Sequence, residues 1–331
     1  MRILLLFILV GTFFVSFVPA HFLNPAITSI DDTSYISHAM TLGLDLDFDY
    51  SNEITKKFNK QGTAPSHPFG FGLLATPFVF AGGLIDMVFD NDVLQNRYEY
   101  SSSWAFFGIL FSVSFYFLLG FYFLLRTIAE RHRSCRHKEF VIFMSAISVI
   151  SSGILYYVLG RFTMSHGLEF GLISSYIYIS HKFQTEEFFS LKDNKLFFYL
   201  LTSSLIVSLM IMLRPANIGL IMLPIIVNYS RVEDYHRKPQ IRGKNINLSL
   251  FFWSIVMFLS GLIIFSFNFT VHEHIWPSSE FLYNTNMLQK KGLPEPLIEI
   301  VLLYFERLPK LVKIFFSSEV GVLFTMPVVF L

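Results

Sequence analysis

The stretch SIDDTSYISHAM, residues 29–40, places two adjacent carboxylates, Asp31 and Asp32, just after the first apolar segment of the chain. A carboxylate can take a proton from a hydroxyl group and so activate that hydroxyl as a nucleophile. Asp31 and Asp32 are therefore candidate catalytic residues. A second interpretation stays open, because one of these carboxylates would also cap a helix that begins near Thr33.

Polar side chains elsewhere in the chain have the chemistry needed to bind a phosphate group. Arginine binds phosphate through paired hydrogen bonds, and cationic groups stabilise phosphate as it leaves. The candidates for substrate or phosphate binding are Tyr35, His67, Arg161, His166 and Arg214. Simpler explanations exist for some of them. His67 precedes Pro68 and fits a turn, and Arg161 and His166 fit polar anchors at helix ends.

The composition is that of a membrane protein. Of 331 residues, 53% are hydrophobic and 15% are charged, and the mean hydropathy is +0.54. Soluble domains carry about 25% charged residues. The formal net charge is +1, so the overall charge gives no reason to expect a nucleic-acid partner. We predict an all-α polytopic membrane protein whose residues 1–331 form a single transmembrane domain.

The apolar segments set the expected number of membrane spans. We expect spans at about 3–20, 103–125, 140–160, 168–180, 196–213, 216–229 and 248–269, with an incomplete span from about 320. The first segment also fits a cleaved signal peptide, but the many later spans favour an uncleaved helix. The last apolar run is too short to cross a bilayer, which predicts a C-terminally truncated chain.

The basic residues predict the side that each loop faces. Lys and Arg gather in the loops after residues 125 and 229, and short cytoplasmic loops are rich in them. Both loops face the cytoplasm only if Phe69–Phe89 lies on the membrane surface or re-enters it without crossing. The N-terminus is then cytoplasmic. Residues 21–102, with surface helices, and residues 270–319 form two external loops, and all the candidate site residues fall on the external side.

Arg214 lies between two short expected spans. A single helix over residues 196–229 would be about 51 Å long at 1.5 Å per residue, against a hydrocarbon core of about 30 Å. A turn at Arg214-Pro215 is therefore required. An ionised side chain below the interface costs about 3 kcal/mol unless it is paired or hydrated, which favours a functional role for Arg214.

The sequence gives little reason to expect a disulfide or a zinc site. The chain has one cysteine, Cys135, so no intrachain disulfide can form. His272, Glu273 and His274 do not have the i, i+4 histidine spacing of a helical zinc site. Metal dependence is left open at Asp32 alone.

Six short motifs follow one another over most of the chain: DDTSYISHAM, LDFDYSNE, SHPFGFGLLATPFVFAGG, GRFTMSHGLEFGL, LRPANIGLIMLPIIV and FFSSEVGVLFTMPVVFL. This ordered set resembles the GT-C glycosyltransferases, in particular the bacterial multispan enzymes similar to protein O-mannosyltransferases and the aminoarabinose transferase of lipid A. The resemblance implies a GT-C-like transmembrane helix bundle with external juxtamembrane helices.

The resemblance also implies an activity. The enzyme would transfer a hexose or pentose from a polyprenyl-phosphate donor to a hydroxyl of a lipid, glycan or protein acceptor, with inversion at the anomeric carbon. Asp31 would deprotonate the acceptor, and Asp32 would orient it or bind a divalent cation. Arg161, His166 and Arg214 would hold the donor phosphate.

The expected location is the bacterial inner membrane, with the active site on the external face. Two alternatives stay open. The chain fits a transporter or flippase for a lipid-linked sugar, or an inactive fragment of such an enzyme.

Overall fold

The described part of the computed structural model is built from helices and turns, without a strand. The structure describes residues 11–16 except 13, 30–50, 65, 67–89, 103–185, 193–214, 217 and 255–266 except 256. The predicted all-α class is confirmed for these residues. Several expected segments lie outside the described residues. They are the span from 320, the loop 270–319 and most of the spans 3–20 and 216–229.

The helices have the following bounds. They are α2 (Ile30–Met40), which continues as the π-helix η2 (Thr41–Asp45), then α3 (Gly70–Val88), α4 (Trp104–Arg131), α5 (Lys138–Ile150), α6 (Ile154–Leu159), α7 (His166–Thr185), α8 (Asp193–Leu213) and a further helix at Met257–Ser266.

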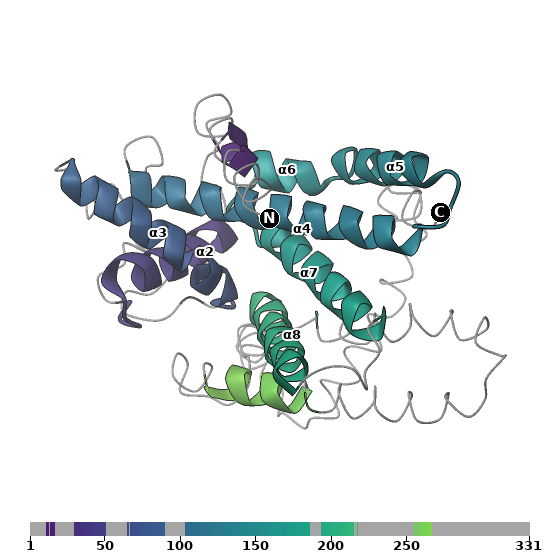
Figure 1. Cartoon of the computed structure of the whole chain (residues 1–331). Coiled ribbons are helices and arrows are strands. Elements are labelled where there is room, and N and C mark those ends of the chain that lie inside the picture. The colour runs from purple at the N-terminus through teal and green to yellow at the C-terminus, as the bar shows by residue number, and fades with distance from the viewer. Residues whose placement is uncertain are drawn as a thin grey trace, which may run out of the picture.

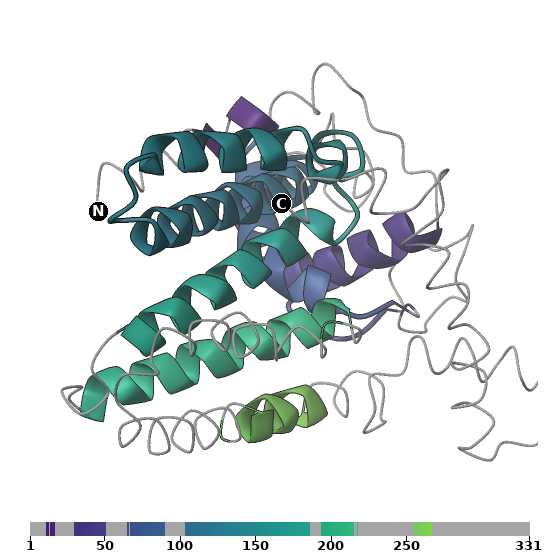
Figure 2. The ribbon, with the colours of Figure 1, turned by 90° about the vertical axis from the view of Figure 1, so that its right-hand side faces the viewer.

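Five helices lie in succession, each packed on the next: α5, α4, α7, α8 and Met257–Ser266 (Figures 1 and 2). Small residues allow close approach. At the crossing of α4 and α7, a Cβ on Gly120 would lie 2.6 Å from the Cα of Gly171. On the next layer, the Ser260 hydroxyl donates to the Ser204 carbonyl at 3.1 Å. Glycine and serine at helix contacts are typical of membrane helix packing.

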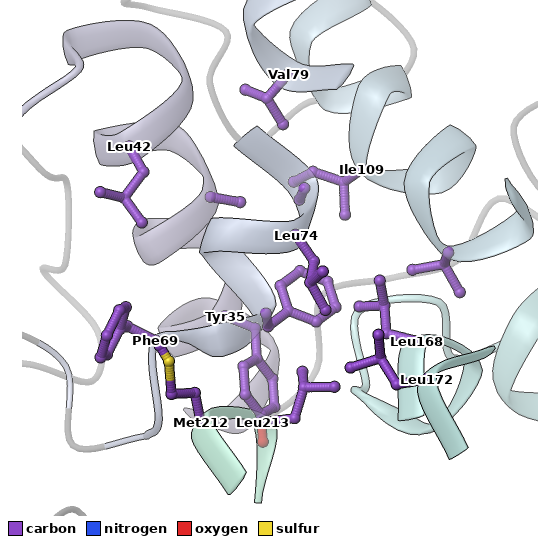
Figure 3. Packing of buried hydrophobic residues seen from close by; sticks show 14 of the residues in the cluster. Tyr35, Leu42, Phe69, Leu74, Val79, Ile109, Leu168, Leu172, Met212 and Leu213 are labelled. Carbon is purple, nitrogen blue, oxygen red and sulfur yellow. The ribbon is translucent and has the colours of Figure 1, made fainter. Parts of the chain in front are cut away.

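The α2 and α3 helices pack on each other, and α3 packs across the first half of α4 (Figure 1). Apolar side chains of α2, α3, α4, α7 and α8 meet in one buried cluster (Figure 3). Ile36, Phe71, Ile109 and Leu168 are completely or almost completely buried there. This cluster packs the five helices against one another.

Two of the described helices, α3 and α4, are long and apolar enough to cross a membrane. The segment Phe69–Phe89, expected on the membrane surface, contains the whole of α3, which is continuous although Pro77 lies inside it. By length and composition α3 can span. Its assignment to the surface, which came from the basic loops, stays a prediction.

The apolar run 140–160, expected as one span, is divided into α5 and α6 by residues 151–153. The Ser152 hydroxyl donates to the carbonyl of Val149 at 2.7 Å, and its oxygen accepts from the N–H of Ile154 at 3.3 Å. Serine side chains compete with the helix for backbone groups, and glycine disfavours the helix. The Ser-Ser-Gly sequence at 151–153 therefore interrupts the run.

The expectation that a helix begins near Thr33 is wrong. The chain is already helical at Ile30, so Asp31 and Asp32 lie inside α2 and neither is its N-cap residue. The carboxylate of Asp32 makes tertiary contacts instead, which form part of the candidate site.

A different carboxylate caps a helix in this structure. The buried Asp86 of α3 accepts hydrogen bonds from the backbone N–H groups of Trp104 at 2.9 Å and Ala105 at 2.8 Å. Ser103 donates its hydroxyl to Asp86 at 3.2 Å and accepts from the N–H of Phe106 at 3.2 Å. Asp86 and Ser103 together satisfy N–H groups in the first turn of α4, which joins α3 firmly to α4.

Candidate functional site

Several helix ends converge at one end of the helical stack. The first residue of α3 touches the last turn of α8, because a Cβ on Gly70 would lie 2.5 Å from the carbonyl carbon of Met212. The turn before α7 packs on the beginning of α4, where the rings of Phe162 and Phe106 lie 5.8 Å apart. The candidate residues lie on or beside these ends.

Asp32 connects α2 to the turn before α7. Its side chain is completely buried. The hydroxyl of Thr163 donates a short hydrogen bond to Oδ1 of Asp32. Nη2 of Arg161 lies 3.4 Å from both carboxylate oxygens. The ion pair joins residues that are 129 positions apart in the chain.

The Asp32 carboxylate also acts on the charge of Arg161. Partial burial by itself lowers the pKa of the Arg161 guanidinium. The charge of Asp32 and hydrogen bonds with Asp32 and Tyr156 raise the pKa by more than burial lowers it, so the pKa lies above its ordinary value. Arg161 is therefore a permanent cation at this end of the bundle.

This arrangement suits Asp32 for holding Arg161 in place. A general base must reach the hydroxyl proton that it removes, whereas the Asp32 carboxylate is buried against Thr163 and Arg161. A guanidinium beside both oxygens also disfavours a divalent cation there. Among the described residues, no three His, Cys, Asp or Glu side chains are grouped to hold a metal ion. The side chain of Asp31 lies outside the described part of the structure.

A second contact group joins α7 to the end of α8. Arg214 donates from Nη2 to Nε2 of His166 at 3.3 Å, and its Nη1 lies 3.8 Å from Oε2 of Glu169. A guanidinium has only donors, so Nε2 of His166 is the acceptor and Nδ1, which lies 3.5 Å from Glu169, carries the hydrogen. The side chain of Asn217 hydrogen-bonds Glu169, and the ring of Tyr157 lies 4.1 Å from that of His166.

A third group contains Tyr35 and His67. The two rings meet edge to face with their centres 5.4 Å apart. Tyr35 is buried, and Figure 3 shows its hydroxyl directed toward the end of α8, near Leu213. His38 fixes this region, because its Nε2 donates to the His67 carbonyl at 2.8 Å and its Nδ1 accepts from the Tyr50 hydroxyl at 2.7 Å.

The chain itself connects the three groups. Tyr35 lies one turn of α2 after Asp32. Thr163 and His166 are three residues apart, so their Cα atoms are separated by at most about 11 Å. The structure thus pairs Asp32 with Arg161, His166 with Arg214, and Tyr35 with His67. The three pairs lie next to one another at these helix ends.

Sequence reasoning missed Thr163, Tyr50 and Asn217. Thr163 carries no motif of its own, but it lies between Arg161 and His166 in a turn that was expected to face the site. That position was the available signal. Tyr50 and Asn217 lie inside two of the short motifs, LDFDYSNE and LRPANIGLIMLPIIV, but nothing in either motif singles them out.

Comparisons of the chain with protein-family models, with curated proteins and with solved structures find no match.

Proposed function

We propose that the protein is an integral-membrane glycosyltransferase that moves a sugar from a polyprenyl-phosphate donor to an acceptor hydroxyl. One observation supports this most directly. Arg161 and Arg214, from separate segments, lie at the same end of an apolar helical bundle, each beside a carboxylate and each partly exposed, by 28% and 41% of the side chain. A lipid-linked phosphate needs an apolar surface for its chain and cationic donors for its headgroup.

The geometry supports the proposed roles of the two arginines and their partner carboxylates, whereas the proposed role of Asp31 rests on the resemblance to the GT-C glycosyltransferases. Arg161 and Arg214 bind the donor phosphate, and Asp32 and Glu169 orient the two guanidiniums. Asp31 takes the proton of the acceptor hydroxyl. The hydroxyl oxygen then forms a bond to the anomeric carbon as the bond between that carbon and the phosphate oxygen breaks, with inversion. Polyprenyl phosphate leaves with the electron pair, and its negative charge is stabilised by the arginines.

In the proposed external, extracytoplasmic site, Tyr35 and His67 line the acceptor side, because they lie next to Asp32 and the end of α8. The acceptor is a lipid, glycan or protein hydroxyl. No step of this scheme passes through a divalent cation, because Asp32 is already paired with Arg161.

Replacing Asp31 with asparagine is expected to reduce sugar transfer at least about 100-fold, because the amide cannot accept the acceptor proton. Full-length protein reconstituted in membranes with labelled polyprenyl-phosphate sugars measures the transfer. Asp47→Asn is the matched control, since Asp47 is an exposed carboxylate in the segment after α2, and it should leave transfer unchanged. Full activity of Asp31→Asn would remove Asp31 from the mechanism.

Replacing Arg214 with glutamine is expected to weaken donor binding about 10-fold or more, because a charge-assisted contact to phosphate is lost. Binding of polyprenyl phosphate to the purified protein measures this. Arg126→Gln is the control. Arg126 is similarly exposed, at 46%, but pairs with Glu130 at the other end of α4. Equal losses in the two variants would mean that overall charge, and not the Arg214 site, attracts the donor.

A further inference from the structure

The turn that joins α4 to α5 carries a dense group of cations. Residues 132–137 are all exposed, and Arg133, Arg136 and Lys138 fall within this turn or at its end. Backbone hydrogen bonds shape it. The N–H of Cys135 donates to the His132 carbonyl at 2.9 Å, and the N–H of Lys138 donates to the Cys135 carbonyl at 3.3 Å. In the part of the chain that the structure describes, no ion pair joins Arg133, Arg136 or Lys138 to a carboxylate.

Cations on the neighbouring helices at this end are used differently. Glu130 lies 2.8 Å from Nζ of Lys182 and 3.2 Å from Nε of Arg126. Arg126 also donates to the Tyr122 hydroxyl at 2.6 Å and lies over the ring of Tyr178. These contacts hold α4 to α7. Arg133, Arg136 and Lys138, by contrast, have no carboxylate partner among the described residues.

An apolar surface begins where the turn ends. Five large apolar side chains of α5 are between 42% and 63% exposed: Phe140, Phe143, Met144, Ile147 and Ile150. Their spacing of three and four residues places them along one side of the helix. No residue of α5 is buried. At 1.5 Å per residue, its 13 residues extend about 20 Å from the cationic turn.

We propose that the α4–α5 turn binds the headgroups of anionic phospholipids, with their acyl chains lying along the exposed face of α5. A phospholipid carries its negative charge and its hydrocarbon in the same order as this surface presents cations and apolar side chains. A nucleic acid would match the cations alone and would leave the α5 face in water. The site is at the opposite end of α4 from Asp32 and does not depend on the proposed transferase activity.

Cys135 offers a direct probe, because it is the one cysteine of the chain and lies exposed in the turn. The full-length protein, labelled there with a fluorophore, is reconstituted in equimolar phosphatidylcholine and phosphatidylglycerol. A trace of either lipid then carries a nitroxide quencher near the top of its acyl chain. We expect phosphatidylglycerol to quench at least about fivefold more than phosphatidylcholine, since even one cation near an anionic surface changes local binding by about that factor.

The triple variant R133Q/R136Q/K138Q should lose this preference, and high salt should weaken it in the unmodified protein. K56Q/K57Q/K60Q removes the same net charge from a different segment and should keep the preference. Equal quenching by both lipids in the unmodified protein would overturn the proposal. The same holds if the turn variant keeps the preference, or if the control variant loses it as fully as the turn variant does.

Discussion

Replacing Gly171 with alanine is expected to lower the free energy of unfolding by about 3 kcal/mol, because the added methyl group must push α7 away from α4. A Cβ at this position would lie 2.4 Å from the backbone oxygen of Tyr116 and 2.9 Å from its carbonyl carbon. Both are backbone atoms, so no change of side-chain rotamer relieves the overlap. Unfolding in mixed detergent micelles, with increasing sodium dodecyl sulfate, measures the loss.

Gly261 provides the matched control for this substitution. It lies in the helix Met257–Ser266, and a Cβ there meets nothing within 4 Å. Gly261→Ala makes the same chemical change in a helix and should leave stability unchanged or raise it by about 0.5–1 kcal/mol through helix propensity. If the two variants unfold alike, the close approach of α4 and α7 is not a feature of the folded protein.

The same substitution also tests how the candidate site is assembled. Gly171 lies two residues after Glu169, which contacts Arg214 together with His166. A shift of α7 would lengthen these contacts, because Arg214 follows the neighbouring helix α8. In the proposed enzyme, Gly171→Ala should therefore weaken donor binding although residue 171 contacts no substrate. Gly261→Ala should not.

Two of the apolar runs in the sequence coincide with long helices of the structure. The runs at 103–125 and 196–213 begin within a few residues of α4 and α8. The end of α4 could not be predicted from hydropathy. The helix continues to Arg131 because Arg126 and Glu130 pair across one turn at 3.2 Å, so the helix extends beyond its apolar part.

The contacts of the candidate site could not be predicted from the sequence. The distribution of basic loops predicted that Asp32 and Arg161 face the same side of the membrane, but it did not predict their contact, which joins residues 129 positions apart. No local pattern specifies such a pair, since it depends on how α2 packs beside the turn before α7. The capping hypothesis for Asp32 failed for the same reason. A short polar motif predicts local hydrogen bonds, whereas this carboxylate is satisfied by Thr163 and Arg161.

Replacing Asp32 with alanine is expected to cost about 3 kcal/mol of stability, because it removes a buried carboxylate from Arg161 and Thr163. We take the lower end of the range for buried pairs, since 28% of the Arg161 side chain is exposed and water can replace part of the interaction. Asp32→Asn keeps an oxygen that accepts from Thr163 and should cost about 1–2 kcal/mol. Unfolding in mixed micelles measures both.

A double-mutant cycle separates the positioning of Arg161 by Asp32 from a catalytic role of Asp32 itself. If Asp32 acts through Arg161, then Asp32→Asn, Arg161→Gln and the double variant should weaken polyprenyl-phosphate binding to a similar extent, with a stability coupling of about 1 kcal/mol. If Asp32 acts on the acceptor, the double variant should transfer sugar more slowly than Arg161→Gln at saturating donor. Thr163→Val completes the comparison, because it removes a hydrogen bond to Asp32 and leaves both charges of the ion pair in place.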